Sequence, residues 1–310
     1  MRVFVAGATG VVGRRLIPLL THQGHAVTAI VRSPEKRPAF ARVGAAPISV
    51  DLFDPAALHA AVRGYDAVVN LATHMPSPPW RMMLRSAWAE NDRVRREGSA
   101  NLVDAAIASG AARFVQESFA PVYPDCGDRW IGEETPIEPV AYNRSIADAE
   151  RSAERFTDSG RTGVVLRFGA FYGPDAGHLA DTIRMVKRGW APMPGPAESY
   201  VSSVSHDDAA RAAAAALIAE PGTYNVVDDE SLTHREYFDS LARALGVPSP
   251  RLPPPWATPL FGSIGKLLAR SQRISNLRFR AATQWEPRYR SVREGWPAAV
   301  AVVDVREPAA

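Results

Sequence analysis

Cysteine is almost absent from this sequence, because Cys126 is the only one among 310 residues. A single thiol excludes an internal disulfide and is typical of a protein in a reducing compartment. The sequence also lacks any uncharged apolar run of about 18 residues, the length that a membrane span needs. Since the chain starts on a predicted core strand, we expect no signal peptide. We therefore expect a cytoplasmic protein with no membrane segment.

Concentrated charge is missing as well. The formal net charge is only +3, and the arginines are scattered along the chain instead of forming basic runs. This pattern argues against a nucleic-acid partner, and we predict no metal site. Hydrophobic residues make up 46% of the chain, which is enough for one large core and a smaller appended lobe.

The first thirteen residues predict a nucleotide-binding turn. Arg2 to Ala6 is a β-branched and aromatic run typical of a buried strand, and a helix is predicted from Arg14 to Leu20. Between them, Gly7 permits a tight turn, Gly10 lets the backbone approach a pyrophosphate, and Gly13 lets the helix pack against the strand. An ordinary glycine turn is the alternative. The predicted cofactor contacts, including the free amides at the helix start, are Gly7, Thr9, Gly10, Val11, Val12 and Gly13.

The spacing Gly-x-x-Gly-x-x-Gly resembles the extended branch of the short-chain dehydrogenase/reductase superfamily, of the NAD-dependent epimerase/dehydratase type. Further strands are predicted at Ala26–Val31, Pro47–Val50, Tyr65–Leu71, Ala112–Gln116 and Gly163–Arg167. Strands that alternate with helices imply an α/β, Rossmann-like, doubly wound parallel sheet. The resemblance implies a nucleotide-binding domain over residues 1–175 and about 196–230. It implies a smaller α+β substrate lobe over about 176–195 and 231–310.

Arg32, at the end of the second predicted strand, indicates which dinucleotide the chain binds. An acidic residue at this position would bind the 2′-hydroxyl of NAD, whereas an arginine pairs with the 2′-phosphate of NADP. No acidic residue comes between Arg32 and Glu35, and Val31-Arg32-Ser33-Pro34 resembles NADP-dependent reductases related to dihydroflavonol reductase. An ordinary solvated arginine is the alternative. We predict NADP (NADPH) as the cofactor.

The resemblance implies further contacts with the cofactor. It places the Asp51 carboxylate near the adenine amine and Leu52 under the adenine ring, although Asp51 could equally cap a helix that begins near Pro55. A long helix is predicted from about Trp80 to Ser109. The contacts that the resemblance implies around the nicotinamide and its ribose are Leu71, Ala72, Thr73, Asn91, Tyr142, Phe168, Gly169 and Phe171.

The catalytic motif of the superfamily is incomplete in this chain. The superfamily uses Tyr-x-x-x-Lys on one helix and a Ser or Thr after the fifth strand. Tyr142 is present, but the lysine position holds Ile146 and the hydroxyl position holds Phe119, with Ser118 one residue earlier. Side-chain alternation weakens just past a strand, so Ser118 either reaches the site or turns away from it. We predict Tyr142 and Ser118 as the catalytic residues.

Loss of the lysine limits the chemistry that Tyr142 can perform. Without a neighbouring cation, the pKa of the phenol stays near about 10, or rises when the ring is buried. A neutral phenol donates a proton more readily than it removes one, which favours carbonyl reduction over alcohol oxidation. Sugar-nucleotide epimerases and dehydratases must first oxidise a hydroxyl and generally hold NAD. Ile146 and Arg32 therefore both argue against that class.

Candidate substrate contacts are His74, Phe119 and His206, although a lone histidine is more often structural. Phe119, Phe168 and Phe171 would make an apolar cleft, which suits an apolar or aromatic ketone; core packing is the alternative. We expect an NADP-dependent ketoreductase, as a monomer or homodimer. The alternatives are a catalytically impaired NADP(H)-binding sensor or scaffold, and a non-redox dehydratase, cyclase or epimerase-type enzyme.

Overall fold

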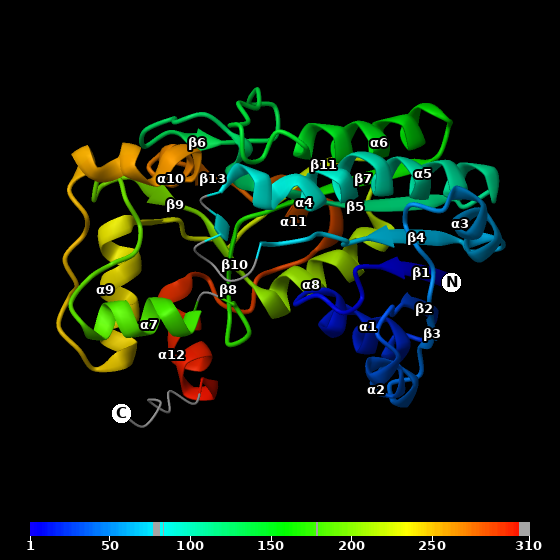
Figure 1. Cartoon of the computed structure of the whole chain (residues 1–310), viewed down its shortest axis with the longest axis horizontal. Helices are drawn as coiled ribbons and strands as arrows, with labels where there is room; N and C mark the ends of the chain where they lie inside the picture. Colours follow the sequence, from blue (N-terminus) through cyan, green and yellow to red (C-terminus); the bar gives the residue numbers. More distant parts are fainter. Residues whose placement is uncertain (77–80, 83, 178, 304–310) are drawn as a thin grey trace.

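The computed structural model describes residues 1–76, 81–82, 84–177 and 179–303. Its centre is a seven-stranded sheet in the order β11-β7-β5-β4-β1-β2-β3, and every neighbouring pair in it is parallel (Figure 1). The strands are β1 (Arg2–Ala6), β2 (Ala26–Ile30), β3 (Ala46–Ile48), β4 (Ala67–Asn70), β5 (Arg113–Phe119), β7 (Thr162–Phe168) and β11 (Gly222–Val226). The predicted Rossmann-like parallel sheet is confirmed, and β11 is an added edge strand that the sequence patterns do not predict.

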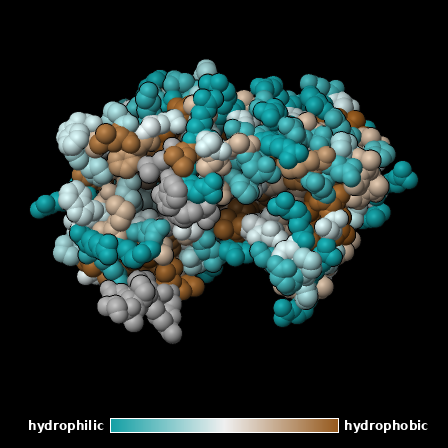
Figure 2. Space-filling model, viewed as in Figure 1, coloured by the Kyte–Doolittle hydropathy of each residue, from teal (hydrophilic) through white to brown (hydrophobic). Residues whose placement is uncertain are grey.

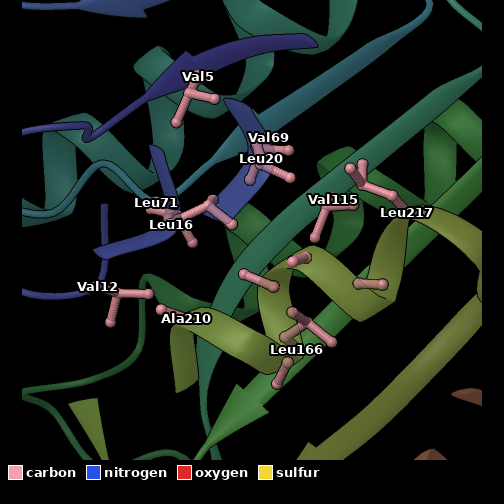
Figure 3. Close-up of a cluster of buried hydrophobic side chains, with 14 of the residues drawn as sticks. Val5, Val12, Leu16, Leu20, Val69, Leu71, Val115, Leu166, Ala210 and Leu217 are labelled. Atoms are coloured by element: carbon pink, nitrogen blue, oxygen red, sulfur yellow. The ribbon is translucent and has the colours of Figure 1, made fainter. Parts of the chain in front are cut away.

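The strands consist of continuous hydrophobic runs because helices cover both faces of the sheet, so that side chains on either face are buried. Val3 and Val5 point to one face, where they pack with α1 and α8, and Phe4 points to the other, where it packs with α3, α5 and α6. The close-up in Figure 3 shows the first of these clusters, with Val5, Leu16 and Ala210 among its side chains. The helices that flank the sheet are α1 (Gly13–His22), α2 (Arg37–Arg42), α3 (Pro55–Val62), α5 (Ser99–Ala108), α6 (Ile146–Asp158), α8 (His206–Ala215) and α11 (Leu277–Thr283).

The predicted helix from about Trp80 to Ser109 runs without interruption from Arg85 to Ala108 but changes its helix type along the way, and Trp80 itself lies outside the described residues. Its successive parts are the 3₁₀ turn η3 (Arg85–Trp88), α4 (Ala89–Arg93), the π-helical turn η4 (Val94–Gly98) and α5. A π-helical turn inside a helix frequently marks a functional site. Short 3₁₀ turns also occur at η1 (Pro34–Lys36), η5 (Ala120–Val122), η6 (Ala216–Ile218) and η7 (Pro255–Phe261).

A second hydrophobic cluster lies beyond the carboxyl ends of the strands and joins Ile183, Phe238 and Trp296 from three helices. These helices are α7 (Leu179–Lys187), α9 (His234–Leu245) and α12 (Val292–Val302); α10 (Gly262–Leu268) lies nearby (Figure 1). Three short pairs complete this part: β6 (Trp130–Ile131) with β13 (Arg273–Ile274), β8 (Ala170–Tyr172) with β10 (Ser203–Ser205), and β9 (Tyr200–Val201) with β12 (Leu232–Thr233). The predicted domain boundaries stay a prediction.

The space-filling view shows the surface hollowed between the α1–α2 side and the α7–α12 side, with hydrophobic residues exposed at the head of the hollow (Figure 2). The strand order reverses between β1 and β4, and in open parallel sheets ligands bind outside the carboxyl ends of strands at such a switch point. In the part of the chain that the structure describes, no helix is both long and apolar enough to span a bilayer.

Candidate functional site

The glycine turn after β1 packs so tightly that a side chain does not fit at Gly7 or at Gly13. Gly7 has a φ of +77°, and a Cβ there would lie 2.3 Å from the carbonyl carbon of Leu71, at the end of β4. A Cβ on Gly13 would lie 2.3 Å from the Gly7 carbonyl oxygen, and the Gly10 amide donates to that same oxygen at 3.0 Å. At its glycines the turn Gly7–Gly13, called the glycine cradle below, therefore presents backbone atoms without side chains. It lies at the switch point of the sheet, between β1 and β4.

This cradle suits the pyrophosphate of a dinucleotide. Thr9 and Gly10 are exposed, Val11 is half-buried, and Val12, the N-cap of α1, provides no side-chain cap. The Arg14 and Arg15 amides of α1 donate to the carbonyl oxygens of Gly10 and Val12, so of the first three amides the Gly13 amide is left for an anionic ligand. The positive end of the helix dipole also favours an anion there. The residues around the turn fit a bound nicotinamide dinucleotide.

Arg32 follows β2 and is exposed, and none of the described residues forms an ion pair with it. The nearby acidic residue Glu35 is occupied by a hydrogen bond from the Ser33 hydroxyl. Arg37, which the sequence patterns do not single out, places its Nε 3.2 Å from the Val31 carbonyl oxygen at the same strand end. Two guanidinium groups thus lie at the end of β2, where a 2′-phosphate would need them.

Asp51 does not cap α3. Its Oδ1 accepts from the Phe53 amide at 3.0 Å, and the N-cap of α3 is Asp54, whose Oδ1 accepts from the Ala57 amide at 3.0 Å. The helix-capping alternative for Asp51 is therefore wrong, and its exposed carboxylate keeps a free face. Leu52 packs against η4, 3.5 Å from the position that a Cβ on Gly98 would take.

Asn91 holds the segment after β4 in place. It is fully buried, and its Oδ1 accepts from the His74 amide at 2.9 Å. Leu71 is buried and Ala72 half-buried, whereas Thr73 and His74 are exposed. The Asn91 side chain therefore fixes this segment by binding the backbone amide of His74. The segment places Thr73 and His74 at the carboxyl edge of the sheet.

Ser118 is turned into the protein interior. It is 1% exposed, and its hydroxyl donates to Glu150 at 2.5 Å. Glu150 is also bound by the Arg167 guanidinium at 2.8 and 2.7 Å, so the three residues form a buried contact between β5, β7 and α6. Because the hydroxyl is engaged there, the geometry gives Ser118 a structural role, and we leave it out of the proposed catalytic set.

Tyr142 lies in the turn that precedes α6 and not on the helix itself. The helix begins at Ile146, which is fully buried, so the predicted placement of both residues on one helix is wrong. The Tyr142 ring makes an edge contact with Trp88, with ring centroids 4.4 Å apart. Burial raises the pKa of Tyr142 to about 12, although the Arg95 charge opposes this rise more than the Glu117 charge adds to it. The phenol is thus neutral at physiological pH and carries a proton that it can donate.

The aromatic residues divide between core and surface. Phe168 is fully buried, so the core-packing alternative holds for its side chain. Phe119 and Phe171 are half-buried, and Phe171 lies 5.6 Å from the His206 ring, centroid to centroid. A Cβ on Gly169 would lie 2.8 Å from the Ser202 carbonyl oxygen, so Gly169 lets β7 pass close to the β10 segment. Phe119 and Phe171 are the phenylalanines left to contact a ligand.

His206 is a core residue of α8. It is 2% exposed, and burial lowers its pKa to about 4, so the ring is neutral at physiological pH. Its Nδ1 would lie 2.6 Å from a Cβ on Gly173, and this contact requires a glycine at that position. The expectation that His206 reaches the substrate is not supported by this burial.

Comparison with known proteins gives consistent matches. The sequence model of the NAD dependent epimerase/dehydratase family matches residues 3–226. A Streptomyces protein, 3-diazoavenalumate denitrifying reductase, is 36% identical over 95% of this chain and 99% of its own length. A 2-alkyl-3-oxoalkanoate reductase from Stenotrophomonas maltophilia is 28% identical over 80% of this chain and 77% of its own length.

Solved structures with the same fold cover nearly the whole chain. Human epimerase family protein SDR39U1 with NADPH superimposes with a TM-score of 0.82 at 22% identity, over 98% of this chain and 100% of its own. The Thermus thermophilus UDP-glucose 4-epimerase complex with NAD gives a TM-score of 0.77 at 26% identity, over 97% of this chain and 98% of its own. These likenesses extend through the second lobe as well as the sheet.

Proposed function

The chain belongs to the NAD dependent epimerase/dehydratase family, and on that premise we propose that it is an NADPH-dependent reductase of a carbonyl on a small apolar or aromatic molecule. The observation that carries the proposal is the protonation state of Tyr142, because burial raises its pKa and keeps the phenol protonated. The position at which the superfamily has a lysine holds Ile146, so no lysine lowers that pKa. Such a group suits proton donation to a forming alkoxide and is poorly suited to alcohol oxidation.

The cofactor half of the proposal depends on the glycine cradle and on Arg32. The cradle would receive the pyrophosphate, and Arg32 with Arg37 would pair with a 2′-phosphate. Bound NADPH would supply the hydride to the carbonyl carbon. Thr73 and the Asn91-anchored segment after β4 would border the ribose of the nicotinamide.

Tyr142 completes the reduction by giving its proton to the carbonyl oxygen. As the carbon gains the hydride, negative charge grows on the oxygen, and the phenol O–H would donate its proton to that charge. Phe119 and Phe171 would pack against the apolar part of the substrate. A sugar nucleotide would need polar contacts instead.

The test measures NADPH oxidation with a panel of aromatic and aliphatic ketones, in the native chain and in Tyr142→Phe. We expect turnover by the native chain and a loss of about 10²- to 10⁴-fold in kcat for the variant, with NADPH affinity unchanged because the ring remains. Tight NADPH binding without turnover of any acceptor would instead favour the sensor or scaffold alternative. Product formed without added nucleotide would favour a non-redox enzyme.

A second candidate acceptor is a diazo group on an aromatic ring. It is favoured by the likeness to 3-diazoavenalumate denitrifying reductase, which extends over 95% of this chain. Replacement of an aryl diazonium group by hydride releases dinitrogen and leaves the arene, with no oxygen atom to protonate. Such a reaction needs neither the missing lysine nor the missing hydroxyl at Phe119.

Tyr142→Phe also separates the two acceptors. We expect the variant to lose carbonyl reduction but to keep reduction of an aryl diazonium salt within about threefold of native, because no proton is transferred to the substrate. Arene formation, measured by chromatography with NADPH and with NADPH omitted, gives the readout. Native activity toward ketones alone would remove the diazo candidate.

A further inference from the structure

Four charged side chains gather beside the glycine cradle. Arg14 and Arg15 come directly after Gly13 and lie in the first turn of α1. The Arg14 Nη2 lies 2.6 Å from Asp175 Oδ2, and the Arg15 guanidinium bonds to the same carboxylate oxygen. The Arg15 Nε also lies 2.5 Å from Asp207 Oδ1, in the first turn of α8. Two cations and two carboxylates therefore meet at the end of α1 that faces the cradle.

Asp175 reaches this cluster from the chain that leads into the second lobe. β8 ends at Tyr172 and α7 begins at Leu179, so Asp175 belongs to the connection between them. In Figure 1, α1 and α7 lie on opposite sides of the hollow that Figure 2 shows. The ion pairs of Asp175 therefore join the helix that begins at the cradle to the connection that enters α7.

The two arginines differ in how firmly they are held. The Arg15 side chain is 20% exposed, and besides both carboxylates it binds the Val11 carbonyl oxygen, to which its Nη1 donates at 2.9 Å. The Arg14 side chain is 44% exposed, and among the described residues Asp175 is the one partner of its guanidinium. Exposed ion pairs contribute little to stability because water screens them. Arg14 can therefore exchange its partner at low cost, whereas Arg15 is fixed in place.

The geometry of α1 directs Arg14 toward the cradle. Cα–Cβ bonds in an α-helix tilt toward its N-terminus, so a long side chain in the first turn extends toward that end. The free Gly13 amide and the positive end of the helix dipole lie there as well. The carboxylate of Asp175 shows that an anionic group fits against this guanidinium. Phosphate oxygens suit it equally, because a guanidinium can bind two of them through parallel hydrogen bonds.

We propose that Arg14 binds the pyrophosphate of the cofactor and that Asp175 competes with the pyrophosphate for Arg14. This inference deepens the cofactor half of the proposed function and rests on it. Cofactor binding exchanges the Arg14–Asp175 ion pair for an ion pair between Arg14 and a phosphate oxygen. Asp175 stays bound to Arg15, so the connection to α7 keeps its place beside α1. The Asp175 carboxylate thereby lowers the affinity of the chain for its cofactor.

Calorimetry with NADPH and with NADH tests the role of Arg14. Both nucleotides contain the pyrophosphate, so Arg14→Met should weaken their binding by the same factor, about three- to tenfold. Arg14→Lys keeps a cation and should lose less affinity than Arg14→Met. A role at the 2′-phosphate, as expected for Arg32, would instead weaken NADPH alone. Unchanged affinity in Arg14→Met, or a loss confined to NADPH, would overturn the proposal.

Asp175→Asn tests the competition. It leaves Arg14 without its carboxylate, so both nucleotides should bind about two- to fivefold more tightly. A gain of affinity cannot come from a misfolded chain, so this result does not depend on how well Arg14→Met folds. Unchanged or weaker binding in Asp175→Asn would refute the competition.

Two further variants separate this exchange from a general effect of charge. The double variant Arg14→Met/Asp175→Asn should bind both nucleotides as Arg14→Met does, because the carboxylate acts through Arg14. Asp104→Asn is the matched control: Asp104 forms an exposed ion pair with Arg155 on the opposite face of the sheet, and its loss should leave both affinities unchanged. A gain that persists in the double variant, or an equal gain in Asp104→Asn, would show that Asp175 does not compete for Arg14.

The outcome also distinguishes this inference from the proposed function. If the variants change nucleotide affinity as expected but no carbonyl is reduced, the proposed reduction fails while the assignment of Arg14 stands. If the native chain binds NADPH and reduces ketones while Arg14→Met binds both nucleotides as tightly as native, the inference alone fails.

Discussion

Gly7→Ala tests the glycine cradle most sharply. The φ of +77° is in the left-handed region, which costs a residue with a Cβ about 1–2 kcal/mol. The new methyl would also lie 2.3 Å from the Leu71 carbonyl carbon and 2.6 Å from the Ala72 nitrogen. Both atoms are backbone, so the end of β4 must shift, and overpacking of this kind costs about 1–3 kcal/mol. We expect a total loss of about 2–5 kcal/mol in the free energy of unfolding.

Gly24→Ala is the matched control, because Gly24 has a φ of +81° and a Cβ there would have no atom within 4 Å. It should lose only the backbone contribution, about 1–2 kcal/mol, and the difference between the variants measures the contact with β4. Denaturant unfolding gives the two free energies, and calorimetry gives NADPH affinity. We expect at least a tenfold weaker affinity for Gly7→Ala and an unchanged affinity for Gly24→Ala. Equal destabilisation together with equal NADPH affinity would refute the cradle.

Three further outcomes are expected. Ile146→Lys buries an amine at a fully buried position, so it should destabilise the fold by about 3 kcal/mol or more without restoring alcohol oxidation; thermal unfolding and the reverse reaction check this. His206 has a folded pKa of about 4, below its usual 6.5, so the unfolded chain takes up the proton first and stability falls as pH drops from 6.5 toward 4. His206→Phe should remove up to about 3 kcal/mol of that decline, measured as unfolding free energies at neutral and acid pH, and a decline as steep as native would contradict it. Arg32→Ala should weaken NADPH binding by about 1–3 kcal/mol and leave NADH nearly unchanged, and equal weakening of both would show that Arg32 does not bind the phosphate.

Local patterns in the sequence predict the scaffold well. The run Arg2–Ala6 forms β1 with the predicted bounds, and the glycines after it form the tight turn, because strand propensity and turn geometry depend on neighbouring residues. The strand Gly222–Val226 escapes prediction since it is half-buried at its start and pairs only with β7 at the sheet edge. Its pairing with β7 is a long-range contact that no local pattern encodes.

The candidate site is less accessible to sequence reasoning. Tyr142 and the absent lysine are both visible in the sequence, but the motif spacing puts the two positions on one helix because it assumes that α6 begins earlier. Ser118 turns inward because Glu150, 32 residues away, accepts its hydrogen bond.

Every proposed step requires a phosphorylated nicotinamide cofactor held at the switch point of the sheet. Isothermal titration of the native chain with NADPH and with NADH is the decisive measurement. We expect saturable one-site binding of NADPH, and at least tenfold weaker binding of NADH because it lacks the phosphate that Arg32 would pair with. Absence of binding by either reduced nucleotide would contradict a cofactor site in this protein.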